Sequence, residues 1–200
     1  MSVPGSPQPT RLELPDLREA HAAVVRRLRW GRLAAVGTMV TVALFLGFLA
    51  TATQAGPRGL VAGLVVVLCV LALFGGLVAF SSRRERQHPG PAGPGPSSFG
   101  QVATTAPGPE VWAAVHAALA RQGFGPTRTT DPNTVVATRS LSMASWGETI
   151  TVRVEGTRDG RGLVTAWSRP AYPLQWLDYG ANRRYANAVL TAIPASGPVA

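Results

Sequence analysis

Two long runs without a charged residue dominate the hydropathy pattern of this chain. The first lies between Arg32 and Arg58 and has 25 residues, and the second lies between Arg58 and Arg83 and has 24. A helix that crosses the hydrocarbon core of a bilayer needs about 20 apolar residues, at about 1.5 Å each. The pattern therefore predicts two transmembrane helices, over residues 33–53 and 59–80, joined as a hairpin by a short Gly-Pro connection.

Two other structures could account for these apolar runs. Buried helices of a soluble protein rarely continue this long without a charge. A signal peptide has a shorter apolar stretch of about 7–15 residues, whereas here the first run begins more than 30 residues into the chain and a second run follows. We therefore expect a two-span protein. Gly59 and Gly63 form a GxxxG motif, which we expect to let the two spans of one chain pack closely rather than to join two chains.

The segment before the first run predicts a short helix. Residues 1–15 are rich in Pro and polar residues, and we expect them to be disordered. Asp16 and Glu19 have the spacing of a capping box, and a stripe at helical spacing follows, at Leu17, His21, Val24 and Leu28. The pattern predicts an amphipathic juxtamembrane helix over residues 16–30. Its Arg residues suit anionic headgroups or serve only as a topology signal.

After the second run the pattern becomes that of a small domain. Residues 87–98 are mostly Pro and Gly and predict an extended tether. We expect one domain over residues 99–195. Its predicted elements are a strand at 101–105, a helix at 109–123, strands at 124–129, 134–141, 148–155 and 162–168, and a helix at 178–193. This β-α-β-β-β-β-α order predicts an α+β fold in which two helices cover one face of an antiparallel sheet.

The dipeptide Asp159-Gly160 is the strongest turn signal in the domain. A two-residue turn there would pair Arg158 with Arg161, and therefore Val152 with Trp167. We expect this register to place Trp167 on the core-facing side of the sheet, with Ile150, Val152, Val154 and Leu163.

The charge distribution predicts the orientation of the chain. All 19 basic residues are Arg, and against 10 acidic residues they give a formal net charge of +9. Arg58 alone lies in the loop between the runs, whereas seven Arg flank the runs on the side of the termini: Arg26, Arg27, Arg29, Arg32, Arg83, Arg84 and Arg86. This asymmetry places both termini in the cytoplasm. We expect a multi-pass protein of the inner cell membrane, whose basic residues meet the lipid bilayer rather than a nucleic acid.

Residues that carry metal or thiol chemistry are sparse. Cys69 is the single cysteine, which excludes an internal disulfide, and the three His are scattered at His21, His88 and His116. We therefore expect no metal site, no cofactor and no catalytic residue. Cys69 is expected to be a small packing residue of the second span.

One stretch of the domain gathers polar and aromatic residues and is the candidate binding surface. The N-terminus of the last helix, with Arg residues nearby, could bind a phosphate or a carboxylate, although Asp178 would cap this helix and repel an anion. The candidate ligand- or partner-binding residues are Trp146, Glu148, Arg169, Trp176, Asp178, Asn182, Arg183 and Arg184. We expect a non-enzymatic domain that binds an anionic ligand or a membrane or cytoplasmic protein, in an oligomeric state that the sequence leaves open.

Two other functions stay open. An enzyme that acts on a lipid or envelope precursor would need Glu148 and Asp178 in convergent geometry for acid and base catalysis. A purely structural membrane subunit would need none of the candidate residues.

Three short motifs carry a resemblance to a known group of proteins. Ser145-Trp146-Gly147-Glu148 precedes an alternating strand, and Ser168-Arg169-Pro170 and Asp178-Tyr179-Gly180-Ala181-Asn182 follow it. They resemble the C-terminal domain of uncharacterised bacterial two-span membrane proteins, in which Ser-Trp-Gly-Glu begins a strand and Asp-aromatic-Gly-x-Asn begins a helix. The resemblance covers about residues 100–193, with Ala181 where the usual pattern has Lys. It implies the domain boundary and membrane attachment, without an established activity.

Overall fold

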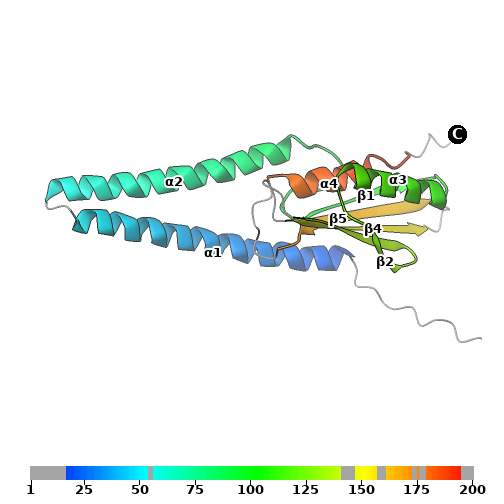
Figure 1. The fold of residues 1–200 in the computed structure, drawn as a ribbon, viewed down its shortest axis with the longest axis horizontal. Helices are drawn as coiled ribbons and strands as arrows, with labels where there is room; N and C mark the ends of the chain where they lie inside the picture. Colours follow the sequence, from blue (N-terminus) through cyan, green and yellow to red (C-terminus); the bar gives the residue numbers. More distant parts are fainter. Residues whose placement is uncertain are drawn as a thin grey trace, which may run out of the picture.

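Two long antiparallel helices and a small α+β domain at their open end make up the chain (Figure 1). The computed structural model describes residues 17–53, 56–140, 147–156, 161–172, 175 and 179–194. The hairpin consists of α1 (Leu17–Ala52) and α2 (Pro57–Arg86). The domain consists of β1 (Ser98–Thr104), α3 (Gly108–Arg121), β2 (Arg128–Asp131), β3 (Thr134–Arg139), β4 (Glu148–Gly156), β5 (Gly162–Pro170) and α4 (Ala181–Leu190).

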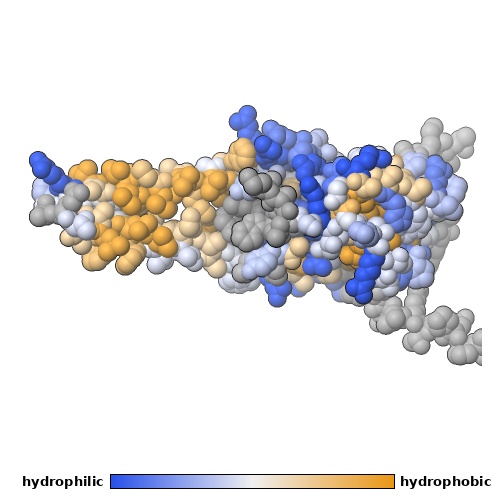
Figure 2. All heavy atoms as spheres, viewed as in Figure 1, coloured by the Kyte–Doolittle hydropathy of each residue, from blue (hydrophilic) through white to orange (hydrophobic). Residues whose placement is uncertain are grey.

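The helical hairpin exposes a belt of apolar side chains. Phe48 in α1 is 67% exposed and Leu60 in α2 is 70% exposed, and Figure 2 shows hydrophobic residues along the hairpin between its loop and the domain. Soluble proteins rarely expose an apolar surface of this extent. Both helices are long and apolar enough to span a membrane. Cys69, expected to be a packing residue, is instead exposed.

The two helices of the hairpin pack closely at Gly47 and Gly63. A Cβ added to Gly63 would lie 2.6 Å from the carbonyl oxygen of Gly47 and 2.6 Å from Cγ2 of Thr51, so only glycine fits. The GxxxG motif therefore packs one helix of the hairpin against the other, as expected. Fourteen residues from Gly47 toward the domain lead to Leu33, where the first apolar run begins, and fourteen from Gly63 lead to Leu77, three residues before the second run ends at Phe80. The two runs therefore end within about 5 Å of one level.

α1 differs from the prediction because it is one continuous helix of 36 residues. The sequence predicted an amphipathic helix over residues 16–30 and a separate span over 33–53, but the helix continues unbroken between them. A helix rises about 1.5 Å per residue, so the part of α1 before Leu33 extends about 24 Å beyond the apolar run. This extension lies alongside the α+β domain (Figure 1).

The five strands form one antiparallel sheet in the order β1-β5-β4-β3-β2. α3 and α4 cover one face, and the core between them and the sheet is built mainly from Val111, Val115, Leu119, Ile150, Val152, Val164, Ala166, Tyr185, Val189 and Leu190. Within the domain the elements follow the expected β-α-β-β-β-β-α order. The helical region has one element fewer than expected, because the juxtamembrane helix belongs to α1.

The pairing of β4 with β5 is one residue away from the predicted register. Val152 pairs with Ala166, not with Trp167. In this register Gly156 pairs with Gly162, so an odd number of residues, 157–161, connects the two strands. The two-residue turn predicted at Asp159-Gly160 instead requires an even number of residues between any two paired positions. Because side chains alternate across a strand, the shift moves Trp167 and Leu163 to the face opposite α3 and α4.

Several element boundaries also differ from the prediction. β1 begins at Ser98, three residues earlier than expected, and β2 covers residues 128–131 instead of 124–129. α4 begins at Ala181, and its N-cap is Gly180 rather than Asp178, which lies outside the described residues.

The Pro/Gly segment between α2 and β1 is not an extended tether. Ala92, Ser97 and Ser98 are each no more than 1% exposed, and the N–H of Gly93 donates a hydrogen bond to the carbonyl of Phe99 at 2.9 Å. Repeated Pro and Gly prevent regular secondary structure, yet they allow a chain to be fixed by contacts with other elements. Most of those contacts come from α4, and Trp167 of β5 and His21 of α1 contact Ser97.

Candidate functional site

The structure describes five of the eight predicted binding residues. Trp146, Trp176 and Asp178 lie outside the described residues, so the geometry of a Glu148–Asp178 pair is not defined. Glu148 is 1% exposed at the start of β4. Its backbone pairs with Pro170, whereas Arg169 pairs with Thr149. Because side chains alternate along a strand, Glu148 and Arg169 face opposite sides of the sheet.

Asn182 is a fully buried residue that joins three parts of the chain. Its side-chain oxygen accepts a hydrogen bond from the Ser168 hydroxyl of β5 at 2.7 Å. Its Nδ2 donates to the carbonyl of Pro96 at 2.8 Å. The Asn182 side chain therefore binds the sheet and the Pro/Gly segment to α4, where the sequence predicted a contact with a ligand.

Asn187 and Arg183 fasten the same segment from further positions of α4. The side-chain oxygen of Asn187 accepts from the N–H of Ala92 at 2.8 Å, and its Nδ2 donates to the carbonyl of His88 at 2.9 Å. Arg183 donates to the carbonyls of Ala92 and Glu85, at 3.2 Å each. Buried backbone groups need hydrogen-bond partners, and these two side chains supply them. Sequence reasoning missed Asn187, although an Asn within the inner stripe of an amphipathic helix indicates a buried polar contact.

Gly180 brings the N-terminus of α4 against the last turn of α2. Its φ is +76°, and a Cβ there would lie 2.9 Å from Cα of Glu85. Any other residue would therefore be strained and would clash with α2. The helix N-terminus that the sequence proposed as an anion site lies next to the chain's own hairpin.

Arg side chains gather where the hairpin meets the domain. Arg184 is exposed, donates to the Tyr185 hydroxyl at 2.8 Å and lies over its ring at 4.8 Å. The predicted membrane-surface residues with described side chains are all exposed: Arg26, Arg27, Arg29, Arg83, Arg84 and Arg86. The side chain of Arg32 lies outside the described set. The pKa of His88 is lowered by partial burial and then by nearby positive charges, from Arg184, Arg183 and Arg84.

α1 covers the second face of the sheet at β1 and β5. The ring of His21 packs on Phe99 and Trp167, with centroid distances of 5.4 Å and 6.4 Å. Trp167 donates from Nε1 to Oγ of Ser97 at 2.9 Å, and the same oxygen lies 3.1 Å from Nδ1 of His21. Partial burial lowers the pKa of His21.

A second polar contact extends this interface toward the start of α1. Arg18 donates a hydrogen bond to the side-chain oxygen of Gln101 in β1, and Nε2 of Gln101 donates to the Thr165 hydroxyl at 2.9 Å. The stripe of the predicted juxtamembrane helix therefore meets the sheet. The face of this helix away from the sheet stays exposed and carries Arg26, Arg27 and Arg29.

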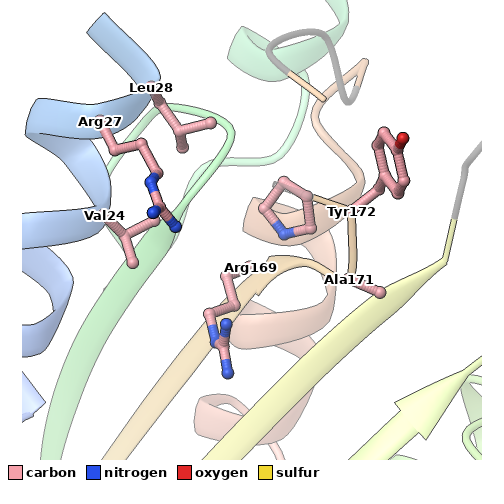
Figure 3. A pocket seen from close by; sticks show the side chains of 7 residues that line it. Val24, Arg27, Leu28, Arg169, Ala171 and Tyr172 are labelled. Atoms are coloured by element: carbon pink, nitrogen blue, oxygen red, sulfur yellow. The ribbon is translucent and has the colours of Figure 1, made fainter. Parts of the chain in front are cut away.

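A small cavity lies between α1 and the end of β5 (Figure 3). Its volume is about 60 Å³, and it is lined by Val24, Arg27, Leu28, Arg169, Pro170, Ala171 and Tyr172. In Figure 3 the Arg27 side chain projects from α1 toward β5, and Arg169 lies across the gap from it. The sequence predicted Arg27 to be a membrane-surface residue and Arg169 to be a binding residue, and the fold brings both to one cavity.

The two Arg residues of this cavity keep unused hydrogen-bonding capacity. The Arg169 guanidinium stacks on Trp167, 5.1 Å from a ring centroid, and its buried Nε–H has no acceptor among the described residues. Within the described part of the chain, neither Arg27 nor Arg169 forms an ion pair. The cavity therefore carries two positive charges without a carboxylate partner in that part of the chain.

Among the described residues, no group of three His, Cys, Asp or Glu side chains could hold a metal ion. The resemblance to bacterial two-span membrane proteins stays a prediction. Comparison of the chain with protein-family models, with curated proteins and with solved structures gives no match in any of the three.

Proposed function

We propose that this chain is a two-span protein of the inner cell membrane with both termini in the cytoplasm. Its α+β domain is a non-enzymatic module that binds a protein or an anionic partner at the membrane surface. The observation that carries the proposal is the continuity of α1, which passes from an exposed apolar run onto the sheet without a break. A domain mounted in this way keeps a fixed height and orientation at the bilayer.

The residues next to the apolar runs support a membrane interface at the domain end of the hairpin. Trp30 is 73% exposed and lies between the Arg-rich part of α1 and the start of the run. At the end of the other run, Phe80 contacts Tyr179 with ring centroids 6.0 Å apart. Exposed aromatic residues are enriched at the headgroup level of membrane proteins, and the Arg excess on this side favours the cytoplasm.

Fixed mounting has a consequence for partner binding. α4 fastens the segment after α2, and α1 packs on the sheet, so the domain cannot sample the volume that a flexible tether allows. A partner on the membrane would meet a surface already oriented toward it, and less rotational freedom would be lost on binding.

The orientation is tested by thiol labelling in a Cys69→Ser background. Thr53→Cys places one exposed thiol at the end of α1 in the loop, and Thr105→Cys places one at an exposed position after β1. In intact spheroplasts, a membrane-impermeant maleimide should label Thr53→Cys and should label Thr105→Cys only after permeabilisation. The reverse pattern would place the domain outside the cytoplasm and overturn the orientation.

Partner binding is tested in the same cells by site-specific photocrosslinking. A crosslinker at Arg184, exposed beside the hairpin, should give a discrete adduct, and one at Arg128, on the outer strand β2, serves as the matched control. An absence of adducts from both positions would favour the purely structural subunit.

A further inference from the structure

The cavity between α1 and β5 lies just beyond the headgroup layer when the hairpin spans a membrane. Arg27 comes six residues before Leu33, the first residue of the apolar run, which is about 9 Å along the helix axis. The polar layer on each side of the hydrocarbon core is roughly 5–8 Å thick. Trp30 lies between these two residues and is exposed, as expected for the interface. The Arg27 guanidinium therefore lies within reach of headgroup phosphates.

The positive charges of Arg27 and Arg169 favour binding of an anion in the cavity. Stacking on Trp167 and the burial of Nε remove part of the water from the Arg169 guanidinium, and a partly desolvated charge is costly without a counterion. Glu148 pairs with Pro170, the residue next to Arg169, but its side chain points to the opposite face of the sheet, which α4 covers. Its carboxylate therefore does not face the cavity. An anion in the cavity would restore the missing partner of both Arg residues.

The size and the walls of the cavity fit a phosphate group. One water needs about 10–15 Å³ of such volume, so about 60 Å³ holds roughly four to six waters, and a phosphate group has five heavy atoms. Arg binds phosphate oxygens with parallel N–H donors, which gives stronger and more specific hydrogen bonds than a point charge does. Val24, Leu28 and Pro170 form an apolar wall beside the two cations, which suits the glycerol part of a lipid.

We propose that Arg27 and Arg169 together bind the phosphate group of an anionic phospholipid in this cavity. The proposal rests on the proposed function, because it requires the hairpin to lie in the membrane. Inorganic phosphate offers the same chemistry from the cytoplasm. A bound lipid would fix the domain against the bilayer at the edge where β5 ends.

The test measures binding of phosphatidylglycerol to the full chain, purified in a neutral detergent, by native mass spectrometry. Arg27→Gln and Arg169→Gln should each weaken binding at least about fivefold. That factor corresponds to the free energy that one cation contributes near an anionic lipid surface. Arg128→Gln removes the same charge from an exposed position of β2 and should bind phosphatidylglycerol like the wild type.

A second variant keeps the proposal testable if Arg169→Gln fails to fold. Ala171→Glu adds a negative charge to the exposed wall of the cavity without replacing either Arg, and it should weaken binding by a similar factor. Ala117→Glu, at an exposed position of α3, makes the same change away from the cavity and should have no effect. Binding by Arg27→Gln and Ala171→Glu that is as tight as that of the wild type, or a loss of binding in the controls Arg128→Gln and Ala117→Glu as large as in these variants, would overturn the proposal.

Titration with inorganic phosphate separates the two sources of the phosphate group. Phosphatidylglycerol binding that millimolar phosphate leaves unchanged supports the lipid. Displacement by phosphate, with the same dependence on Arg27 and Arg169, would assign the site to free phosphate and overturn the lipid as its ligand. Because the assay uses purified protein in micelles, it does not depend on orientation. Its failure is therefore distinguishable from a reversed labelling pattern in spheroplasts.

Discussion

At the scale of single residues, buried amides of α4 replace the hydrogen bonds that the Pro/Gly segment cannot form with itself. Asn182 and Asn187 both donate and accept hydrogen bonds toward that segment or the sheet. The sequence predicted a ligand site at Asn182, because several polar residues gather near the start of the last helix. It could not indicate that one partner of Asn182 lies 86 positions earlier, since only the fold brings Pro96 to α4.

His21 makes the interface between α1 and the sheet sensitive to pH. Burial lowers its pKa from the ordinary 6.5, so the folded chain binds this proton less tightly than the unfolded chain does. The stabilisation from neutral His21 is therefore complete above about pH 6.5 and is lost as the pH falls below that value. We expect the thermal unfolding midpoint in detergent to decrease as the pH is lowered from about 7.5 to about 5.5. This decrease should be smaller in His21→Gln than in the wild type.

Two comparisons make the His21 result specific. The pKa of His88 is also lowered, so the variant with both His21→Gln and His88→Gln should lose more of the decrease than either single variant. His116→Gln, at an exposed position of α3, should behave like the wild type. An unchanged pH dependence in His21→Gln would show that the α1 interface does not carry the effect.

At the scale of elements, the sequence predicted correctly those features that depend on the local period of one element. It did not predict the features that depend on contacts between distant parts of the chain. The length of the apolar runs and the alternation in β4 follow from the period of each element. The β4–β5 register depends on the length of the connection, and one residue of difference moved Trp167 to the other face. A helical stripe such as that of His21 and Leu28 shows that one face is buried, but it does not identify the surface it meets.

Gly63 sets the spacing of the two hairpin helices. Gly63→Val would place a side chain against Gly47 and Thr51, where even a Cβ has only 2.6 Å. We expect a loss of about 1–3 kcal/mol in the free energy of unfolding, the usual cost of forcing extra atoms into a packed interface. The measurement is unfolding of the purified chain by SDS in mixed micelles.

Gly76→Val is the matched control in the same helix. A Cβ at Gly76 meets no described atom within 4 Å outside the local helix backbone, so the free energy of unfolding should stay the same or rise slightly, because glycine is a poor helix former. Equal losses for Gly63→Val and Gly76→Val would show that helix spacing at Gly63 does not limit stability.

At the scale of the whole molecule, α1 couples the helical hairpin to the domain, so that rotating one part of α1 about its axis changes how the domain sits on the hairpin. Consecutive residues of a helix are turned by about 100°, so one Ala inserted after Gly31 would rotate the part that carries His21, Val24 and Leu28 relative to the apolar run. The stripe would then turn away from the sheet while the span keeps its packing on α2. Gly31→Ala adds the same side chain without the rotation, and a Cβ there meets no described atom within 4 Å beyond the local backbone.

The coupling is measured by crosslinking across the cavity. Val24→Cys and Ala171→Cys, in the Cys69→Ser background, place one thiol on each wall, and a short bismaleimide should join them in the parent chain and in Gly31→Ala. We expect the insertion to lower the yield of the crosslinked peptide pair, quantified by mass spectrometry, because about 100° of rotation carries the thiol on α1 away from β5. An unchanged yield would mean that α1 bends or breaks at Gly31 and stays on the sheet, so that the domain is held by contact alone. A lowered yield would instead make the unbroken helix the element that sets the angle between the domain and the hairpin, because the contacts of α4 are the same in both chains.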